Sequence, residues 1–212
     1  GCSYCAIPMI RGKFRSRSME SILAEAEGLA ARGVKELVVV AQDTSRYGED
    51  LYGESKLPEL LEALCRIEGF VWIRTLYCYP ERITDRLLDV IAKEDKLVKY
   101  LDIPLQHCSG HVLEAMNRSG DRKSLTALMK KIRERIPGMT LRTTLIAGFP
   151  GETKEDFAEL MDFVHETAFE RLGCFAYSAE EGTKAAAMEN QVPEKTKLRR
   201  ADHIMEQQMF IN

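Results

Sequence analysis

Apolar and polar residues alternate along this chain in blocks that predict strands and helices in turn. Short unbroken apolar runs, such as residues 36–41, are typical of strands buried on both faces of a parallel sheet. Stretches with apolar residues three and four positions apart, such as residues 18–32, predict amphipathic helices. Five strands are predicted in this way, at residues 36–41, 70–76, 100–104, 140–147 and 171–177.

Helices are predicted between and after these strands, and several begin at a residue that can cap them. Ser18, Thr84 and Thr153 carry hydroxyls able to accept a backbone hydrogen bond at a helix start, and Ser55 is a candidate for the same role. Gly33 ends the first helix, since glycine readily adopts the left-handed conformation found there. The predicted helices cover residues 18–32, 57–67, 84–91, 110–117, 122–136 and 153–164, and a terminal helix opens at Pro193.

Strands that alternate with helices form parallel sheets with right-handed crossovers. No Gly-rich or Ser/Pro-rich linker interrupts the pattern, so we expect residues 1–212 to form one domain. Five strands are too few for a closed eight-stranded barrel and suit an open or partial barrel, particularly if one more strand precedes Gly1. In such folds the functional residues lie at the C-terminal ends of the strands. Because Gly1 already stands inside a motif, we expect the chain to be part of a longer protein.

Composition and charge narrow the class of protein. Hydrophobic residues make up 45% of the chain, enough for a sizeable core. A net charge of −3, from 30 basic and 33 acidic residues, argues against strong nucleic-acid binding, although a basic run at residues 11–17 allows a local contact. No apolar run reaches the length of a membrane span and no signal-peptide pattern is present, so we expect a cytoplasmic protein without a membrane partner.

The cysteines offer the clearest candidate chemistry. Only Cys2 and Cys5 are close in sequence, and without secretory signals a disulfide framework is not expected. A C-x-x-C pair alone is compatible with half of a zinc site, a redox pair or part of an iron–sulfur ligand set. Zinc needs four ligands, and neither a second C-x-x-C nor a pair at zinc-finger spacing is present. The other cysteines are Cys65, Cys78, Cys108 and Cys174, and the histidines show no metal pattern.

Polar, aromatic and glycine residues follow the predicted strands. Glycines on both sides of Phe149-Pro150 would let the backbone approach a ligand closely, or would form a tight turn without one. Gln42-Asp43 could bind a ligand or form a polar turn, and His107 could contact a ribose or a substrate. Arg142 shares one strand face with Gly148 by the two-residue period, where it could bind a carboxylate or form a salt bridge at the barrel floor.

These motifs resemble the radical S-adenosylmethionine (radical SAM) superfamily, whose signature is C-x-x-x-C-x-aromatic-C in the loop after the first strand of a six-stranded partial barrel. Cys2, Tyr4 and Cys5 match the aromatic and the last two cysteines, while the first cysteine would lie four residues before Cys2. Within the superfamily, residues 2–8 and 146–153 are similar to the methylthiotransferases. Residues 41–48 and 103–107 are similar to the branch that modifies an aspartate of small-subunit ribosomal protein twelve, whereas the tRNA-modifying branch has Gly-Gln-Asn-Val-Asn at the first of these places.

The resemblance implies an α/β fold, a partial (β/α)6 TIM-type barrel whose first strand lies ahead of Gly1. It implies a radical SAM core over residues 1–212, without the N-terminal domain and small C-terminal β domain of full-length members. It also implies a [4Fe–4S] cluster held by Cys2 and Cys5, a second cluster in the absent N-terminal domain, and S-adenosylmethionine (SAM) on the open iron. The cofactor-binding residues it implies are Tyr4, Gln42, Asp43, Gln106, Arg142, Gly148 and Phe149. Tyr4 would lie against the adenine or serve only to pack its loop.

The resemblance further implies radical chemistry. SAM would be cleaved to a 5′-deoxyadenosyl radical, which abstracts hydrogen from the β-carbon of the substrate aspartate before sulfur insertion and methyl transfer from a second SAM. The implied partners are the ribosomal protein or its subunit and an electron donor such as flavodoxin. The alternatives are methylthiolation of a tRNA adenosine and a metal-binding scaffold without catalysis. Since sulfur handling would use the second cluster, we expect this chain alone to cleave SAM at most.

Overall fold

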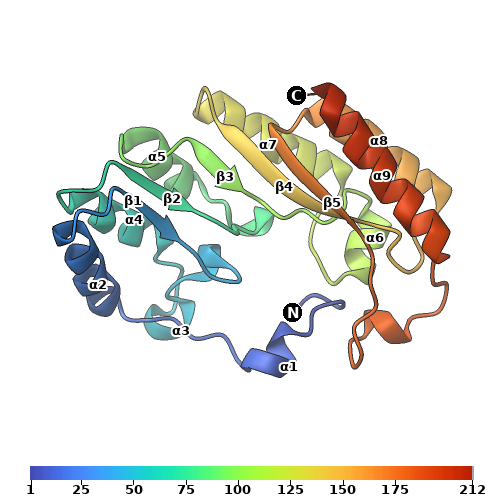
Figure 1. Cartoon of the computed structure of the whole chain (residues 1–212), viewed down its shortest axis with the longest axis horizontal. Helices are drawn as coiled ribbons and strands as arrows, with labels where there is room; N and C mark the ends of the chain where they lie inside the picture. Colours follow the sequence, from blue (N-terminus) through green and yellow to red (C-terminus); the bar gives the residue numbers. More distant parts are fainter. Residues whose placement is uncertain (212) are drawn as a thin grey trace. The chain divides into compact units, whose positions relative to one another are not determined.

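The structure is a computed structural model that describes residues 1–211. Five strands alternate with helices along these residues (Figure 1), and the strand pairs Glu36–Val39 with Trp72–Thr75 and Thr140–Ala147 with Arg171–Ala176 are parallel. The strands are β1 (Glu36–Val39), β2 (Trp72–Thr75), β3 (Tyr100–Asp102), β4 (Thr140–Ala147) and β5 (Arg171–Ala176). They form two sheets, of order β1–β2 and β3–β4–β5, and two separate sheets do not close a barrel. The prediction of an α/β fold with an incomplete barrel is therefore confirmed.

The chain divides into two compact units, which we describe one at a time. Unit 1 comprises Gly1–Lys13, Pro104–Lys130 and the residues from Arg142 onward. Unit 2 comprises Phe14–Ile103 and Lys131–Leu141. Helix α7 (Arg122–Arg135) and strand β4 (Thr140–Ala147) each run from one unit into the other.

Unit 2 is built on the parallel pair β1 (Glu36–Val39) and β2 (Trp72–Thr75), with Glu36 opposite Trp72. Helices α4 and α5 bury continuous leucine-rich faces, because their apolar residues recur at helical spacing. The other elements of this unit are α2 (Met19–Ala31), α3 (Glu49–Tyr52), α4 (Leu57–Arg66), α5 (Asp85–Lys93), β3 (Tyr100–Asp102) and the 3-10 turns η1 (Thr44–Arg46) and η2 (Pro80–Arg82).

Strand β1 is less buried than its apolar sequence predicts. Val38 is 43% exposed and Val40, just after the strand, is 61% exposed. Glu36 and Val38 on one face are exposed and Leu37 and Val39 on the other are only half-buried, so neither face of β1 is fully covered by other elements. The predicted strand is confirmed, but the prediction that both of its faces are buried is wrong.

Unit 1 is built on β4 and β5 (Arg171–Ala176), which pair in parallel with Arg142 opposite Arg171. Along β4 the odd-numbered residues are buried and the even-numbered ones are more exposed, as the two-residue period requires. Helices α8 and α9 lie side by side, and α9 packs against β5 (Figure 1). The helical elements of this unit are α1 (Ile7–Arg11), α6 (Gly110–Ala115), α8 (Lys154–Thr167), α9 (Glu194–Ile211) and the 3-10 turn η3 (Ala185–Ala187).

Three of the four predicted helix caps are present. The hydroxyls of Ser18, Thr84 and Thr153 each accept a backbone N–H from three residues ahead. The prediction for Ser55 is wrong, because its hydroxyl donates instead to the carbonyl of Ser45 at 2.7 Å. Helix α4 begins after Lys56 with Pro58 in its first turn, where the fixed φ of proline suits a helix start.

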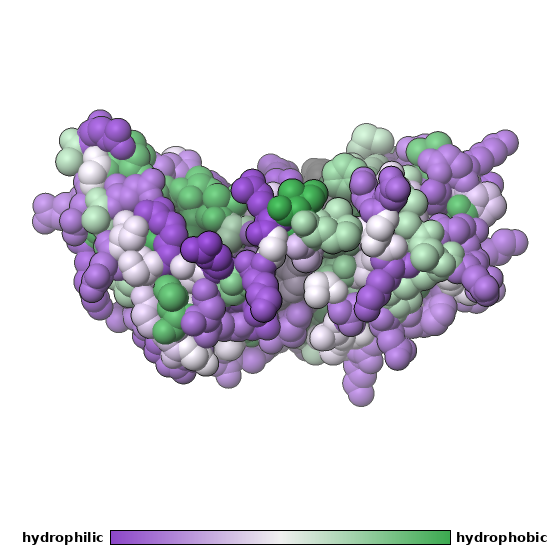
Figure 2. All heavy atoms as spheres, turned by 90° about the horizontal axis from the view of Figure 1, so that it is seen from below, coloured by the Kyte–Doolittle hydropathy of each residue, from purple (hydrophilic) through white to green (hydrophobic). Residues whose placement is uncertain are grey.

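The exposed surface is mixed. Figure 2 shows hydrophilic side chains over most of the face in view, with smaller groups of hydrophobic ones between them. Within residues 1–211, no helix combines the length and the apolar composition that a membrane crossing requires.

Candidate functional site

The loop that carries Cys2 and Cys5 is a tight turn anchored inside unit 1. The Cys5 N–H donates to the Cys2 carbonyl at 3.2 Å, so the two cysteines belong to one turn. Ser3 lies between them. Its N–H donates to the Met116 carbonyl at 2.9 Å and its hydroxyl donates to the Ala115 carbonyl at 2.8 Å, at the end of α6. Both cysteines are partly exposed. Their thiols therefore stand on a fixed turn that a metal centre can reach.

The donor set of this turn fits two corners of an iron–sulfur cluster. Among residues 1–211, no three His, Cys, Asp or Glu side chains gather where they could hold a metal ion. Two thiols alone do not make a structural zinc site, which takes four ligands. A cluster needs one further cysteine beside Cys2 and Cys5, and this agrees with a signature of three cysteines.

Arg118 lies beside the turn and was not singled out by the sequence. Its side chain is largely buried, Nη1 lies 3.7 Å from Cys2 Sγ, and Nη2 donates to the Pro104 carbonyl. Hydrogen bonds to cysteine sulfur and nearby charge set the reduction potential of iron–sulfur clusters. No pattern in the sequence distinguishes this arginine, which follows α6 in a loop, from an exposed one.

An aromatic cluster joins the cysteine turn to the end of β4. The rings of Tyr4 and Phe149 meet edge to face, with centroids 6.1 Å apart, and Phe149 meets Tyr177 in the same way at 5.3 Å. Phe149 is fully buried. The hydroxyl of Tyr177 is buried with no hydrogen-bond partner among the described residues. The structure therefore brings Tyr4 and Phe149 together.

Both the backbone conformation at position 148 and the neighbouring Lys197 side chain favour a glycine there. Its φ of +75° lies in the region that favours glycine, and a Cβ built there would overlap Lys197 Cγ and lie 2.7 Å from Lys197 Cβ. Its N–H donates to Glu152 Oε1 at 3.0 Å. The backbone at the end of β4 is therefore fixed from both sides.

Gln106 and Arg142 also belong to unit 1. Gln106 has a φ of +72°, a strained conformation for a residue other than glycine, and its backbone bonds to Thr144 and Ile146 hold it there, both at 2.8 Å. Arg142 is exposed on the face of β4 that also carries Thr144 and Ile146. Both residues therefore lie on or beside β4, on elements that fix their backbones.

His107 does not face a ligand. It is fully buried, its Nε2 lies 3.0 Å from Glu152 Oε2, and its Nδ1 accepts the Ser109 N–H at 3.0 Å. The suggestion that it contacts a ribose or a substrate is therefore wrong. Cys78 and Cys108 are equally buried, and burial raises the pKa of the Cys78 thiol to about 11, which leaves it protonated at neutral pH.

Gln42 and Asp43 belong to unit 2. Gln42 is exposed, whereas Asp43 is buried, accepts the Ser45 hydroxyl and lies 3.8 Å from Arg82 Nε. Burial raises the pKa of the Asp43 carboxyl, and the Ser45 hydrogen bond and Arg82 oppose that rise. The carboxylate is thus held by its own unit, while the Gln42 side chain is open to a ligand.

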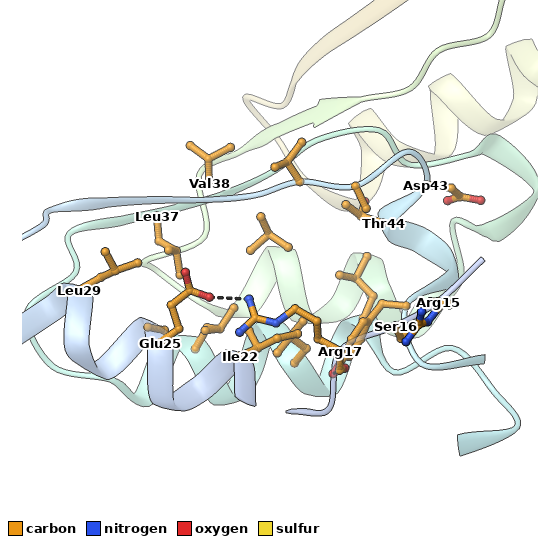
Figure 3. Close-up of a pocket in the computed structure, with 18 of the residues that line it drawn as sticks. Arg15, Ser16, Arg17, Ile22, Glu25, Leu29, Leu37, Val38, Asp43 and Thr44 are labelled. Atoms are coloured by element: carbon orange, nitrogen blue, oxygen red, sulfur yellow. Dashed lines mark hydrogen bonds and ion pairs between the residues drawn. The ribbon is translucent and has the colours of Figure 1, made fainter. Parts of the chain in front are cut away.

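A cavity of about 440 Å³ lies within unit 2 between α2, β1 and α4 (Figure 3). Its walls are mainly apolar, with Ile22, Leu29 and Leu37 on them, and the ion pair of Arg17 with Glu25 lies beside these residues. Asp43 and Thr44 border it as well. An apolar lining does not suit the charged amino and carboxylate groups of SAM.

Comparison with known proteins decides the family. Residues 1–164 match the family model of the Radical SAM superfamily. The chain belongs to the radical SAM superfamily. Membership implies a [4Fe–4S] cluster and SAM as cofactors.

Curated relatives of this radical SAM chain carry a more specific name. "Ribosomal protein uS12 methylthiotransferase RimO" of Pelotomaculum thermopropionicum is 57% identical over 211 residues, which are 100% of this chain and 48% of the relative. The protein of the same name from Clostridium tetani is 54% identical over 210 residues, 99% of this chain and 47% of the relative. The chain spans about half the length of the curated relatives it matches.

Solved structures support the fold of this radical SAM chain. Coproporphyrinogen III oxidase (HemN) from Escherichia coli superposes with a TM-score of 0.69 at 20% identity, covering 100% of this chain and 49% of that one. The radical SAM methyltransferase TsrM from Kitasatospora setae, with cobalamin and a [4Fe–4S] cluster bound, gives 0.68 at 18% identity, covering 87% of this chain and 36% of that one. At such identities the likeness shows the fold alone.

Proposed function

We propose that this chain is the radical SAM core of an enzyme that methylthiolates the β-carbon of an aspartate in ribosomal protein uS12. The observation that carries the proposal is the 57% identity, along the whole chain, to a relative named as the uS12 methylthiotransferase. The similarity of residues 41–48 and 103–107 to the ribosomal-protein branch supports the same substrate.

The residues of unit 1 divide between metal and cofactor. Cys2 and Cys5 hold two irons of the cluster, and Arg118 offsets the negative charge of the Cys2 thiolate. Tyr4 packs the adenine of SAM against the ring cluster that it forms with Phe149. Backbone groups of Gly148 and Phe149 would contact the same adenine.

Further polar residues bind the rest of SAM. Gln106 binds SAM, and Arg142 binds a carboxylate, either that of SAM or that of the substrate aspartate. Gln42 and Asp43 bind the amino group of SAM, with the exposed Gln42 as the more accessible of the two. When bound, the cluster and SAM supply the one-electron chemistry that removes hydrogen from the substrate carbon, and the protein binds and orients them.

The remaining components lie outside these residues. Sulfur for insertion comes from a second iron–sulfur cluster in another domain of the enzyme. The electron comes from a donor such as flavodoxin, and the reaction takes place in the cytoplasm. The substrate is uS12 itself or the ribosomal subunit that contains it.

SAM cleavage tests the proposal directly. The chain is preceded by Cys-Xaa-Xaa, which places the signature's first cysteine four positions before Cys2, and is reconstituted anaerobically with iron and sulfide. Addition of SAM and dithionite is expected to release 5′-deoxyadenosine, measured by chromatography. Cys2→Ala and Cys5→Ala should each abolish this release, whereas Cys65→Ala, in helix α4, should not. Bound zinc with no cleavage of SAM would instead identify a metal-binding scaffold.

A further inference from the structure

A buried cluster of charged and polar groups lies within unit 1, centred on the Glu152 carboxylate. The Glu152 side chain has no exposed surface. Its Oε2 lies 3.0 Å from His107 Nε2, and its Oε1 accepts from Arg200 Nη1 at 2.6 Å and from the Gly148 N–H at 3.0 Å. Burying ions is costly, and well-packed apolar residues of similar volume often stabilise a fold at least as well. A role in holding neighbouring segments in a defined geometry therefore explains this cluster better than a contribution to the stability of the fold.

The hydrogen bonds of the cluster fix the orientation of each member. Because the Ser109 N–H donates to His107 Nδ1 at 3.0 Å, that nitrogen has no proton. Nε2 then carries the proton and donates a hydrogen bond to Glu152 Oε2. The carboxylate thus accepts three hydrogen bonds, from an imidazole, a guanidinium and a backbone amide. None of these three groups can act as an acceptor here, so the direction of each hydrogen bond is fixed.

The cluster adjoins two of the predicted cofactor-binding segments. His107 directly follows Gln106, and Gly148 directly precedes Phe149. Both Gln106 and Gly148 have left-handed backbones, with φ of +72° and +75°. Arg200 adds a third anchor from α9, because its Nη1 also donates to the Glu152 carbonyl at 3.2 Å. One buried carboxylate therefore ties together the residue after Gln106, the end of β4 and helix α9.

We propose that Glu152, with His107 and Arg200, is a positioning group that holds Gln106 and Gly148–Phe149 in the geometry that SAM requires. The inference rests on the proposed function, since that function assigns these residues to SAM. Phe149 also packs against Tyr4 in the cysteine turn, so a displacement at Glu152 reaches the cluster ligands. None of the three side chains needs to touch SAM for this role.

Three variants and one matched control test the proposal. Glu152→Gln keeps the shape but points an amide NH2 at one of the three donors. Arg200→Gln removes the partner charge, and Arg200→Lys keeps the charge but replaces the planar guanidinium, whose Nη1 makes both contacts with Glu152, by a flexible ammonium group. The control is His111→Asn, because His111 also contacts a carboxylate of unit 1, Asp156 at 3.2 Å, but its side chain is 64% exposed.

Two readouts separate positioning from folding. Hydrogen–deuterium exchange of the peptide containing Gly148 is followed in the chain without cofactor. SAM affinity is measured by calorimetry on the reconstituted protein with three cysteines, at a temperature where urea titration shows every variant folded. We expect roughly tenfold faster exchange at Gly148 and roughly tenfold weaker SAM binding in Glu152→Gln and Arg200→Gln, with Arg200→Lys intermediate and His111→Asn unchanged.

Each outcome has a distinct meaning. Folded variants that bind SAM as tightly as the wild type would overturn the inference, and so would unchanged exchange at Gly148. If Glu152→Gln does not fold, the two Arg200 variants test the inference instead. Arg200→Lys should then bind SAM more tightly than Arg200→Gln, and equal affinities would contradict the inference. Failure of the reconstituted wild type to bind SAM would remove the proposed function and, with it, the assignment of SAM to these strand ends. The exchange data would then still report separately whether Glu152 holds the end of β4.

Discussion

Gly148 shows how a single residue fixes the end of a strand. Its positive φ and the contact with Lys197 both disfavour a β-carbon, whereas Gly138 has a similar φ of +79° and no heavy atom within 4 Å of its Cβ position. We expect Gly148→Ala to lower the free energy of unfolding by about 2–4 kcal/mol, from backbone strain and overpacking together. The control Gly138→Ala should cost about 1–2 kcal/mol, from strain alone. Urea titration measures both, and equal losses would show that Lys197 moves aside at no cost.

Four of the six cysteines have a raised thiol pKa; of these, Cys65, Cys78 and Cys108 are buried, whereas Cys174 is partly exposed. Burial raises the pKa of the thiols of Cys65 and Cys78 to about 11 and that of Cys174 to about 12, and it raises the pKa of Cys108 as well. At pH 8 a thiol of pKa 11 is ionised in about one molecule per thousand, and the thiolate is the reactive form. We expect iodoacetamide to modify Cys2 and Cys5 first, as followed by mass spectrometry of peptides. Equal labelling of Cys78 would contradict the burial of its loop.

At the scale of the element, the sequence predicts helix starts well where the signal is local. Thr153 and Asp156 form a capping box at the start of α8, and their three-residue spacing is visible in the sequence. Ser55 has an equally suitable hydroxyl, but Ser45, ten residues away, takes its hydrogen bond, and no local pattern reports that. The exposure of β1 was unpredictable for a similar reason, because the burial of a strand depends on which distant elements pack over its two faces.

Asp156 makes the start of α8 sensitive to acid. Although burial raises the pKa of its carboxyl, hydrogen bonds from Ser109, Thr153 and His111 outweigh this and lower it to about 2. Since the folded pKa lies below the unfolded one, the stabilisation is complete above about pH 4 and is lost as the pH falls towards 2. We expect Asp156→Asn to lower the free energy of unfolding by about 1–2 kcal/mol at pH 6 and by much less at pH 2.5. Urea titration at both pH values, with the exposed neighbour Glu155→Gln as control, measures this.

At the scale of the whole molecule, motifs predicted the family and long-range contacts completed the site. The C-x-x-C turn and the Gly-Phe-Pro-Gly segment are short and contiguous, so their likeness to the radical SAM superfamily was visible in the sequence. Arg118 and the partners of Glu152 come from distant segments: Arg200 lies in α9 and His107 follows β3. Their polar side chains show no periodicity that separates a buried position from an exposed one. Only the fold reveals that they meet the cysteine turn and the end of β4.

The chain's length relative to its relatives leads to a prediction about how much of the reaction it performs. It spans 48% of the Pelotomaculum RimO length. Hydrogen abstraction needs the cluster and SAM, whereas sulfur insertion needs a sulfur donor as well. We therefore expect the chain supplied with its third cysteine to release 5′-deoxyadenosine but to leave a uS12 peptide without a methylthio group. Mass spectrometry of the peptide gives the answer, with a full-length RimO relative as positive control. Replacement of a peptide hydrogen by SCH3, a net gain of CH2S, with this chain alone would show that sulfur insertion needs no further domain.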